Sequence, residues 1–589
     1  MPITASFLIH LDGDPLPEDI AGLLSSAVVD DSLHLPDSFA LRFRDPGRVV
    51  VSRSKVKIGS AVKVSVLGAD SQAPETLING EVTALEAEFD GGGTFTVIRG
   101  YDQAHRLHRG RRTESYTQMT ASDVAVKVAK RAGLSLGPIE ATTTVYDHVT
   151  QGGVTDAQFL KALARESGHE LAVRDGKFEF RTPRRATEAP SPGGEPSSNP
   201  LVLQLGTDLL RFRAVVTSAG QVGSVEVRGW DVASKRPLIA TVPAQTTSAS
   251  LPGTTPSDLA KVFGDPVHVA TEVPFRLQAE VDAAAKALSE ELASSFAEFE
   301  GVARGNSKLR ADTAIAIDNI GAPFDGQYTI TTSRHRYDAV TGYTTSFSVT
   351  GRHERSLLGL ASSRSAGAGV PGVVVGQVSD VRDPQDQGRV TVTYPWLSDT
   401  YVSDWARTVQ LGAGKDRGAM FVPEVGDEVV VAFEQGDMRR PYVLGGVHNG
   451  MDEPSPGPVE LVDGGSGAVN RRSVVSRRGH RVDLLDQAGG KDGISVVTGD
   501  GALSLVLDAT GTAVTLRSDG TVEIKAARGV VVDAGSADLD LKGGRVSITG
   551  SSGVTVDGGG GPVEVSSGTQ LSLKGGAQCS ISAALVKIN

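Results

Sequence analysis

Residue pairs that could support acid–base or metal chemistry are few in this sequence, and none has a complete set of partners. His105 and His108 lie three residues apart in a basic loop, but a zinc site needs further ligands and the neighbouring sequence offers no third one. Glu166 and His169 flank Gly168, which we expect to end a helix, and the sequence shows no group that would orient either side chain as a general acid or base. Neither pair predicts a catalytic or metal site.

Two glycine-rich runs match phosphate-binding loops in part, but in the wrong context. Residues 367–372 (GAGVPG) fit GxGxxG, yet they precede a strand instead of a helix, so they are interpreted as a linker. Residues 412–415 (GAGK) lack the spacing and the following Ser or Thr of a P-loop and are interpreted as a turn. Asp483 and Asp486 are interpreted as solvated carboxylates. We predict a protein that is not an enzyme and that binds no cofactor and no metal.

The composition favours a chain of several, mostly β, domains. Its 589 residues exceed the roughly 250–300 residues at which a single hydrophobic core stops growing. Aromatic residues make up only 5%, whereas there are 70 glycines, and this balance suits short strands joined by tight turns. The formal charge of -12 argues against nucleic acid as a partner, because a phosphate backbone would be repelled. The basic run at residues 106–112 is interpreted as a solvated or partner-facing loop.

The sequence also limits the compartment in which the chain folds. The single cysteine, Cys579, excludes an intrachain disulfide framework and favours a reducing compartment. The first fifteen residues have no basic region followed by a long apolar stretch, so they do not predict a secretory signal. No segment approaches the roughly 20 apolar residues of a membrane helix. We expect the protein to leave the cell, if at all, as part of a larger assembly.

The N-terminal part is expected to form a β-barrel followed by a small α+β insert. Short runs in which apolar and polar residues alternate, separated by turns, predict an antiparallel barrel or sandwich over residues 1–112. Two helices are expected within residues 113–182. Thr155 and Gln158 form a capping-box pair at the start of the second helix, and Gly168 ends it.

The middle of the chain contains two segments that interrupt the strand pattern. Residues 183–200 (PRRATEAPSPGGEPSSNP) are predicted to be a flexible loop, because they cannot bury enough apolar surface to order themselves. Strands resume in residues 201–360, which are predicted to form a second β-barrel with a long helix at about 277–299. Residues 361–372 are predicted to be a linker between domains.

The C-terminal part begins with a compact barrel and ends in a repeat. About five strands in residues 373–450 predict a small Greek-key barrel of the OB type, and residues 451–493 form a neck. In residues 494–589, pairs of apolar residues spaced i and i+2 recur mostly every seven to nine residues, with Gly, Asp or Ser between them. A strand places both members of such a pair on one face, so each repeat has an apolar stripe to bury.

A repeat of about eight residues is too short to enclose its own core. A single-chain solenoid would need roughly 18 or more residues per coil, so we favour three chains wound round one axis with the stripes inside. This intertwined trimeric β-helix, or β-prism, predicts a homotrimer. The residues expected in the needle core are Val522, Ile524, Val530, Val532, Leu539, Leu541, Val546, Ile548, Val554, Val556, Val563, Val565, Leu571, Leu573, Ile581, Val586 and Ile588.

A series of ordered motifs in residues 373–450 matches a known domain family. The residues concerned are Gly388, Trp396, Trp405, Pro423, Gly426, Asp427, Gly436, Asp437, Pro441 and Gly445. With these motifs the block resembles the OB-fold domain of VgrG-type and phage baseplate spike proteins. So many matches in order make the resemblance specific.

The N-terminal half resembles the phage late-control D, or tail-hub, module. The matching motifs include Gln151, residues 155–160 (TDAQFL) and residues 229–231 (GWD). The resemblance implies two related hub β-barrels per chain, so that a threefold spike can mate with a sixfold tube. It implies the structural central spike of a phage-tail-like contractile injection system. Such a trimer caps the inner tube, organises the baseplate and punctures the target envelope when a sheath contracts.

The resemblance also implies partners, and this sequence departs from some relatives. The partners are the inner tube protein, baseplate proteins, a PAAR-like tip protein and, in some relatives, effector cargo; the target membrane is met only on firing. A separate tip protein is expected because no histidine follows His480, whereas some spikes bind iron through a His-x-His tip. Only about 40 residues separate Gly450 from the first repeat, too few for the lysozyme domain of some phage spikes.

These departures favour an extracellular or cytoplasmic phage-tail-like particle over a type VI secretion system. We expect synthesis in the bacterial cytoplasm without a signal peptide, in a particle that stays cytoplasmic or is released. Two alternatives stay open. A spike that also degrades cell wall would require a catalytic insert, and a host-binding fibre or adhesin should bind cells without a tube or sheath.

Overall fold

The computed structural model describes residues 6–68, 73–356, 370 and 372–588 of the chain. These residues form two compact units that meet at the Glu453–Pro454 bond. Strands far outnumber helices, which confirms the predicted class of a mainly β protein with a small α+β part. No helix in the described ranges is long and apolar enough to cross a membrane.

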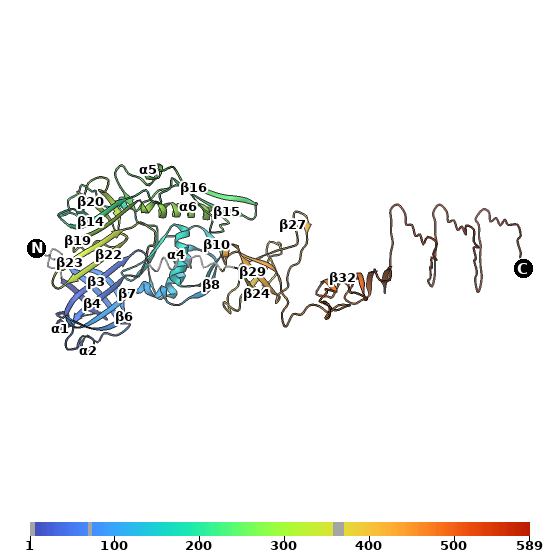
Figure 1. Cartoon of the computed structure of the whole chain (residues 1–589), viewed down its shortest axis with the longest axis horizontal. Coiled ribbons are helices and arrows are strands. Elements are labelled where there is room, and N and C mark those ends of the chain that lie inside the picture. The colour runs from blue at the N-terminus through green and yellow to red at the C-terminus, as the bar shows by residue number, and fades with distance from the viewer. Residues whose placement is uncertain (1–5, 69–72, 357–369, 371, 589) are drawn as a thin grey trace. The chain divides into compact units, whose positions relative to one another are not determined.

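The seven strands of the first predicted hub barrel and four strands of the second belong to one eleven-stranded sheet (Figure 1). Its order is β14-β19-β23-β22-β3-β4-β7-β6-β5-β1-β2. The N-terminal strands are β1 (Ser6–Leu11), β2 (Asp14–Pro15), β3 (Leu24–Ser32), β4 (Ser38–Arg44), β5 (Ala61–Leu67), β6 (Glu75–Asp90) and β7 (Gly93–Asp102), with short helices α1 (Glu18–Ala21) and α2 (Val50–Ser54). The later strands are β14 (Leu209–Val216), β19 (Ala297–Arg304), β22 (Thr332–Asp338) and β23 (Gly342–Val349).

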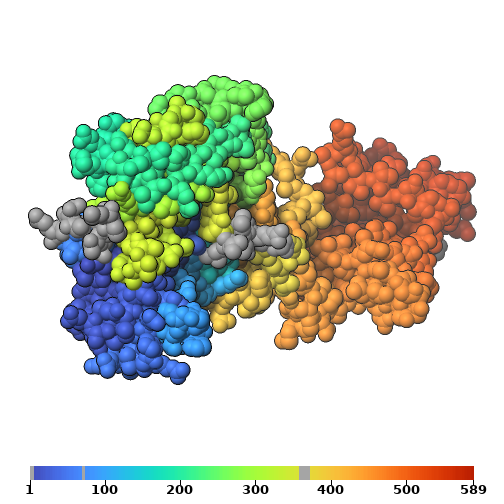
Figure 2. Space-filling model, turned by 60° about the vertical axis from the view of Figure 1, so that its left-hand side comes forward, coloured from blue at the N-terminus to red at the C-terminus, as the bar shows by residue number. Residues whose placement is uncertain are grey.

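The two halves of this sheet are joined where β3 pairs with β22 in antiparallel register. Arg334 on β22 binds Asp30 on β3, and the ring of Phe7 lies 5.1 Å from Tyr337 and 5.2 Å from Tyr343. In the space-filling view the blue N-terminal lobe and the green lobe lie on either side of the yellow-green strands (Figure 2). The two halves therefore share one continuous sheet, while each half has a hydrophobic core of its own.

The α+β insert follows the sequence prediction closely. Its elements are η1 (Gln103–His108), β8 (Arg112–Thr120), α3 (Ala121–Arg131), β9 (Ser135–Ile139), β10 (Val145–Val154), α4 (Asp156–Ser167), β11 (Glu170–Arg174) and β12 (Lys177–Arg181). Thr155 caps α4 in a reciprocal capping box with Gln158, and Gly168 ends the helix in the left-handed region at φ 71°. Both predicted ends of this helix are confirmed.

The prediction of a flexible loop at residues 183–200 is wrong. The segment contains the short helix η2 (Ala186–Glu188), and Ala186 is completely buried. The Ala186 N–H donates to the Thr247 carbonyl (2.7 Å), and the Gln327 side chain donates to the carbonyl of Ala189 (2.9 Å). The prediction considered only the apolar surface that the segment itself can bury. In the structure, hydrogen bonds to Thr247 and Gln327, which lie outside the segment, hold its backbone in place.

The remaining elements of the second half include the long helix α6 (Gln278–Ala293), which packs on β15 (Ser224–Asp231) and β16 (Arg236–Pro243). The others are β13 (Val202–Gln204), β17 (Ala249–Ser250), α5 (Pro256–Lys261), β18 (Val267–Ala270), η3 (Ser294–Phe296), β20 (Ala314–Asp318) and β21 (Gly326–Thr329). The helix predicted at 277–299 ends earlier than expected. Ala297 already begins β19, where Phe299 is fully buried between Ala214 and Val349.

Residues 373–450 form a closed five-stranded barrel. Its elements are β24 (Val373–Asp380), β25 (Thr391–Thr393), β26 (Arg407–Thr408), β27 (Ala413–Gly414), β28 (Arg417–Gly418), β29 (Glu428–Phe433), η4 (Glu434–Gly436) and β30 (Pro441–Gly446). The sheet order is β25-β24-β29-β30-β26, and a bridge between Val390 and Ala406 joins its two ends. Most of the predicted linker, residues 361–369 and 371, lies outside the described residues.

The C-terminal unit begins with an antiparallel meander. Its strands are β31 (Arg471–Val475), β32 (Arg481–Asp486), β33 (Asp492–Val497), β34 (Leu503–Asp508) and β35 (Ala513–Ser518). The needle was predicted to start at residue 494, but residues 494–518 complete this meander. Turns of four and five residues separate β33, β34 and β35, so the chain can fold back on itself there. From Asp519 to Ile588 no described residue is in a strand.

Candidate assembly interface

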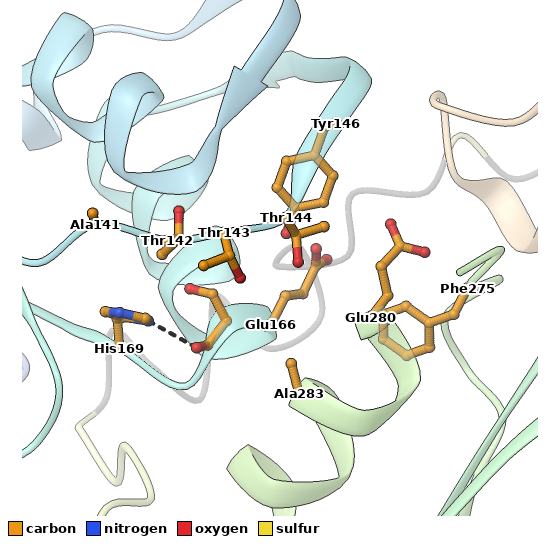
Figure 3. Close-up of a pocket in the computed structure, with 11 residues that line it drawn as sticks. Ala141, Thr142, Thr143, Thr144, Tyr146, Glu166, His169, Phe275, Glu280 and Ala283 are labelled. Carbon is orange, nitrogen blue, oxygen red and sulfur yellow. Dashed lines mark hydrogen bonds between the residues drawn. The ribbon is translucent and has the colours of Figure 1, made fainter. Parts of the chain in front are cut away.

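The cavity beside α4 and α6 does not have the free groups of an active site (Figure 3). Its volume is about 170 Å³, and it is lined by residues that include Glu166, His169 and Glu280. The Glu166 carboxylate accepts two hydrogen bonds from Arg439 (3.0 and 3.1 Å). Glu280 accepts from the backbone N–H groups of Arg276 and Leu277 (3.0 and 3.1 Å) at the start of α6. Both carboxylates therefore have structural partners.

His169 is also held in place by its surroundings. Its Nδ1 lies 2.7 Å from the Ser167 carbonyl oxygen, as the dashed line in Figure 3 shows, and its ring stacks on Phe180 at 4.9 Å. The Nδ1–H group donates to the Ser167 carbonyl at the end of α4, and this hydrogen bond holds the imidazole ring against the helix end. Glu166 and His169 therefore both have structural partners, in line with the absence of a predicted catalytic site at this pair.

His105 and the two aspartates are likewise paired within the chain. His105 lies 2.9 Å from a carboxylate oxygen of Glu81, and burial lowers the pKa of His108 to about 4. Asp483 is buried instead of solvated, and Arg481 binds it at 2.7 Å, whereas Asp486 is exposed. Among the described residues, no three His, Cys, Asp or Glu side chains are grouped as metal ligands would be.

Several residues of the OB motif shape the barrel backbone. Gly388, Gly426 and Gly436 have φ of 69°, 98° and 81°, a region that favours glycine. The Gly426 N–H donates to the Val378 carbonyl (2.9 Å), which ties the turn before β29 to β24. The Asp427 carboxylate accepts from the Glu424 N–H (2.8 Å) within the same turn, which also contains the half-buried Pro423.

The remaining motif residues connect the strands. The indole N–H of Trp396 donates to the Val375 carbonyl (2.8 Å), so the half-exposed ring lies against β24. Trp405 is partly buried and precedes β26. Pro441 opens β30, and Gly445 pairs with Val430 on β29.

Asp437 and Arg439 connect the OB barrel to the α+β insert. Arg439 binds Asp437 (2.9 Å) within the barrel and Glu166 (3.0 Å) on α4. Burial opposes ionisation of Asp437, but the Arg439 guanidinium outweighs it and lowers the pKa of that carboxyl. A sulfur of Met438 fills the space that a side chain on Gly152 would need.

Two further contacts complete this junction. The hydroxyls of Thr150 and Tyr401 lie 3.0 Å apart, and Arg276 binds Glu434 at 3.1 Å. Thr150 ties the insert to the OB barrel, and Arg276 ties the segment before α6 to the same barrel, in both cases across more than 150 positions of sequence.

The meander of the C-terminal unit has one bare apolar face. Strand register places the following side chains together on that face: Val482, Leu484, Ile494, Val496, Leu505, Leu507, Val514 and Leu516. Each of them is 39–72% exposed. On the opposite face Asp483, Leu485 and Ser495 are buried, and Arg471 and Arg481 donate to the carbonyls of Ser455 and Pro456. A sheet with this much exposed apolar surface needs a partner.

The segment from Asp519 to Ile588 also lacks partners, for its backbone as well as its side chains. Within the described residues of this segment, backbone groups bond to each other only at Ala537–Ala534 and Gly561–Gly558. Every residue predicted for the needle core is at least 49% exposed. Extended backbone with unpaired N–H and C=O groups is a template for pairing with other chains. Burial of these residues in a trimer stays a prediction.

Glycines set the corners between the repeats. A Cβ on Gly550 or Gly575 would lie 2.1 or 2.2 Å from the carbonyl oxygen three residues ahead, that of Gly553 or Gln578. A Cβ and a carbonyl oxygen cannot come this close, so any side chain at either position would force the backbone to move. The adjacent Gly576 has no atom within 4 Å of the same position.

Replacing Gly575 by alanine is therefore expected to destabilise the needle, whereas Gly576→Ala leaves it nearly unchanged. The clash occurs once per chain and should cost about 1–3 kcal/mol for each copy. Thermal dissociation of the full-length assembly measures the difference. Equal midpoints for the two variants would contradict the corner geometry.

The comparisons with known proteins agree with this organisation. Residues 374–448 match the family described as the type VI secretion system/phage-baseplate injector OB domain. The spike protein VgrG1a of Pseudomonas aeruginosa is 40% identical over 81 residues, 13% of this chain and 13% of that protein. VgrG3 of Vibrio cholerae is 34% identical over 107 residues, 17% of this chain and 10% of that protein. The chain thus matches less than a fifth of the length of these relatives.

The fold resemblance extends much further than the sequence match. The structure of the Francisella PdpA–VgrG complex, half-lidded, covers 87% of this chain and 88% of its own, with a TM-score of 0.51 and 8% identity. A second family model, described as the Alg8 N-terminal domain, matches residues 49–338, which include strands of both hub halves and the insert. The chain therefore contains an OB domain of the type VI secretion system/phage-baseplate injector kind, and its fold is similar to that of the Francisella VgrG complex.

Proposed function

We propose that this chain is the structural central spike of a contractile injection system. The observation that carries the proposal is the segment from Asp519 to Ile588, whose apolar pairs are exposed and whose backbone is almost unpaired in the single chain. Three copies would bury the stripes against each other and pair the strands between chains. The result is a stiff needle continuing from a VgrG-like hub and OB barrel.

In this proposal the homotrimer caps the inner tube, organises the baseplate and is driven into the target envelope when a sheath contracts. Its partners are the inner tube protein, baseplate proteins and a PAAR-like tip protein, with effector cargo as a further partner class. A Francisella VgrG forms a complex with another protein, PdpA, which supports a further protein partner for this chain by analogy. The chain would act through shape and stiffness without enzymatic activity; Glu166, His169 and His105 each have a structural partner within the chain.

The producing cell would make the chain in its cytoplasm and assemble it into a particle that is either retained or released. The test is deletion of the gene followed by recovery of sheathed particles. We expect no complete baseplates and no killing of target cells, both restored by the wild-type gene. Normal particles without this chain would contradict the proposal.

The native Cys579 offers a test of the trimer without an engineered residue. It takes the place of the first apolar residue of a pair, before Ile581, and is exposed in the single chain. In the trimer three such thiols would face one axis. Mild oxidation is expected to link two of every three chains through a disulfide, because one thiol is left without a partner.

The matched control moves the thiol by one position, with Cys579→Ser and Ser580→Cys together. A shift of one residue turns the side chain to the outer face of a strand, so this variant should not cross-link. Denaturing electrophoresis without reductant distinguishes the two. Cross-linking of the control but not of the native chain would contradict the assigned register.

A further inference from the structure

The OB barrel has two separate exposed apolar patches that its own fold does not explain. The first, here called the β27–β28 loop patch, consists of Leu411, Met420, Phe421 and Val425, which are 93%, 64%, 56% and 60% exposed. Figure 1 shows the loop around β27 extending away from the barrel strands. Large apolar side chains gathered on one projecting loop indicate a docking surface.

The β27–β28 loop patch is held in a fixed shape. Gln410 accepts a hydrogen bond from the Phe421 N–H (2.8 Å) and donates to the Thr408 hydroxyl (2.9 Å). The Ala419 N–H donates to the Gly412 carbonyl (3.2 Å) across the base of the hairpin. A loop ordered before binding loses less conformational entropy when it docks, so these bonds favour association.

The second patch lies on the outer surface of β24. Trp396 is 55% exposed and Val375 is 42% exposed, and the indole N–H donates to the Val375 carbonyl (2.8 Å). Asp399, which is exposed, lies three residues after Trp396 in the sequence. We call these three residues the Trp396 patch.

The two patches consist of different residues on different segments of the barrel. The β27–β28 loop follows β26, and in the closed order β25-β24-β29-β30-β26 the strands β24 and β26 are not neighbours. A contact that builds a closed ring requires two different patches on each subunit, one for each neighbour. A twofold contact would instead require one self-complementary patch.

The charges of the two patches are complementary. The tip of the β27–β28 loop has Lys415 and Arg417, both exposed and without an ion-pair partner within the part of the chain that the structure describes. The Trp396 patch presents Asp399 and an aromatic face, to which a guanidinium or ammonium group is attracted. The occupant of each patch is therefore expected to be a second copy of this chain.

We propose that, in the trimer, the β27–β28 loop patch of each chain docks on the Trp396 patch of the next chain, so that three OB barrels form a ring. This contact rests on the proposed function, because it requires three copies around one axis. It adds a second interface between chains, separate from the needle.

The test places a photo-crosslinking residue, p-benzoylphenylalanine, at Leu411 of the full-length chain. This position is 93% exposed, so the substitution leaves the fold intact. After irradiation of the purified assembly and full denaturation, we expect a product of twice the chain mass. Peptide mass spectrometry should locate the link within residues 394–400 of the second chain. The same residue at Val340, 92% exposed in the hub, is the control and should give no link to that peptide.

The outcomes separate this contact from the proposed function. A trimer in which position 411 links elsewhere, to residues of its own chain, to another particle protein, or to nothing overturns the ring contact alone. A chain that stays monomeric overturns the proposed function as well. Reversing the loop charges with Lys415→Glu and Arg417→Glu should lower the yield of the specific link at least about threefold, and an unchanged yield overturns the charge pairing.

Discussion

Replacing Val554 and Val556 together by aspartate is expected to abolish the trimer of the full-length chain. Both side chains belong to one apolar pair, and they are 54% and 74% exposed in the single chain. In the assembled needle the double substitution would place six carboxylates near one axis. Each buried charge without a partner costs several kcal/mol, so the total exceeds about 10 kcal/mol for each trimer. Native mass spectrometry should detect single chains.

The control for this prediction is Thr555→Asp. It adds a carboxylate to the same strand, but the alternation of a strand turns position 555 to the outer face. We expect a trimer with nearly unchanged thermal dissociation. If the double variant remained as trimeric as the control, the apolar pairs would not form the core of the needle.

Replacing Arg439 by methionine is expected to weaken the junction between the OB barrel and the insert. The guanidinium is buried between Asp437 and Glu166, with contacts of 2.9 and 3.0 Å. Its removal leaves two carboxylates without a cation, and breaking a buried pair in this way costs about 3–5 kcal/mol. We expect faster hydrogen exchange in α4 and in η4, together with a lower unfolding midpoint of the N-terminal unit.

Arg382→Met is the matched control on the same barrel. Arg382 also binds an aspartate, Asp380, at 2.8 Å, but its side chain is 87% exposed. Solvent screens such a pair, so little change is expected. Equal hydrogen-exchange behaviour of the Arg439 and Arg382 variants would show that the junction does not depend on the buried cation.

Local signals predicted much of the fold from the sequence. The capping box at Thr155 and the stop at Gly168 depend on residues within one helix, and both were found where expected. All five OB strands begin within two residues of their predicted starts, because alternation of apolar residues is a local pattern. Strand β26 is clearly shorter than predicted, since it ends at Thr408 instead of Leu411. The apolar pairs of the needle followed from periodicity in the same way.

Long-range contacts account for what the sequence did not predict. The pairing of β3 with β22 and the bond between Arg439 and Glu166 join residues hundreds of positions apart, and no local pattern indicates them. The order of residues 183–200 depends on Gln327 and Thr247, which lie outside the segment. Asp483 was interpreted as solvated because the sequence does not show that it is buried and bound by Arg481. The meander at 494–518 was assigned to the needle because its apolar pairs have nearly the same spacing as those of the later repeats.

The native mass of the full-length chain tests the central claim most directly. The bare face of the meander and the unpaired backbone after Asp519 predict a trimer that persists on dilution and resists dissociation by detergent at room temperature. Mass photometry at nanomolar concentration, followed by electrophoresis of unheated and boiled samples, would show it. A stable, soluble monomer of the full-length chain would contradict the account.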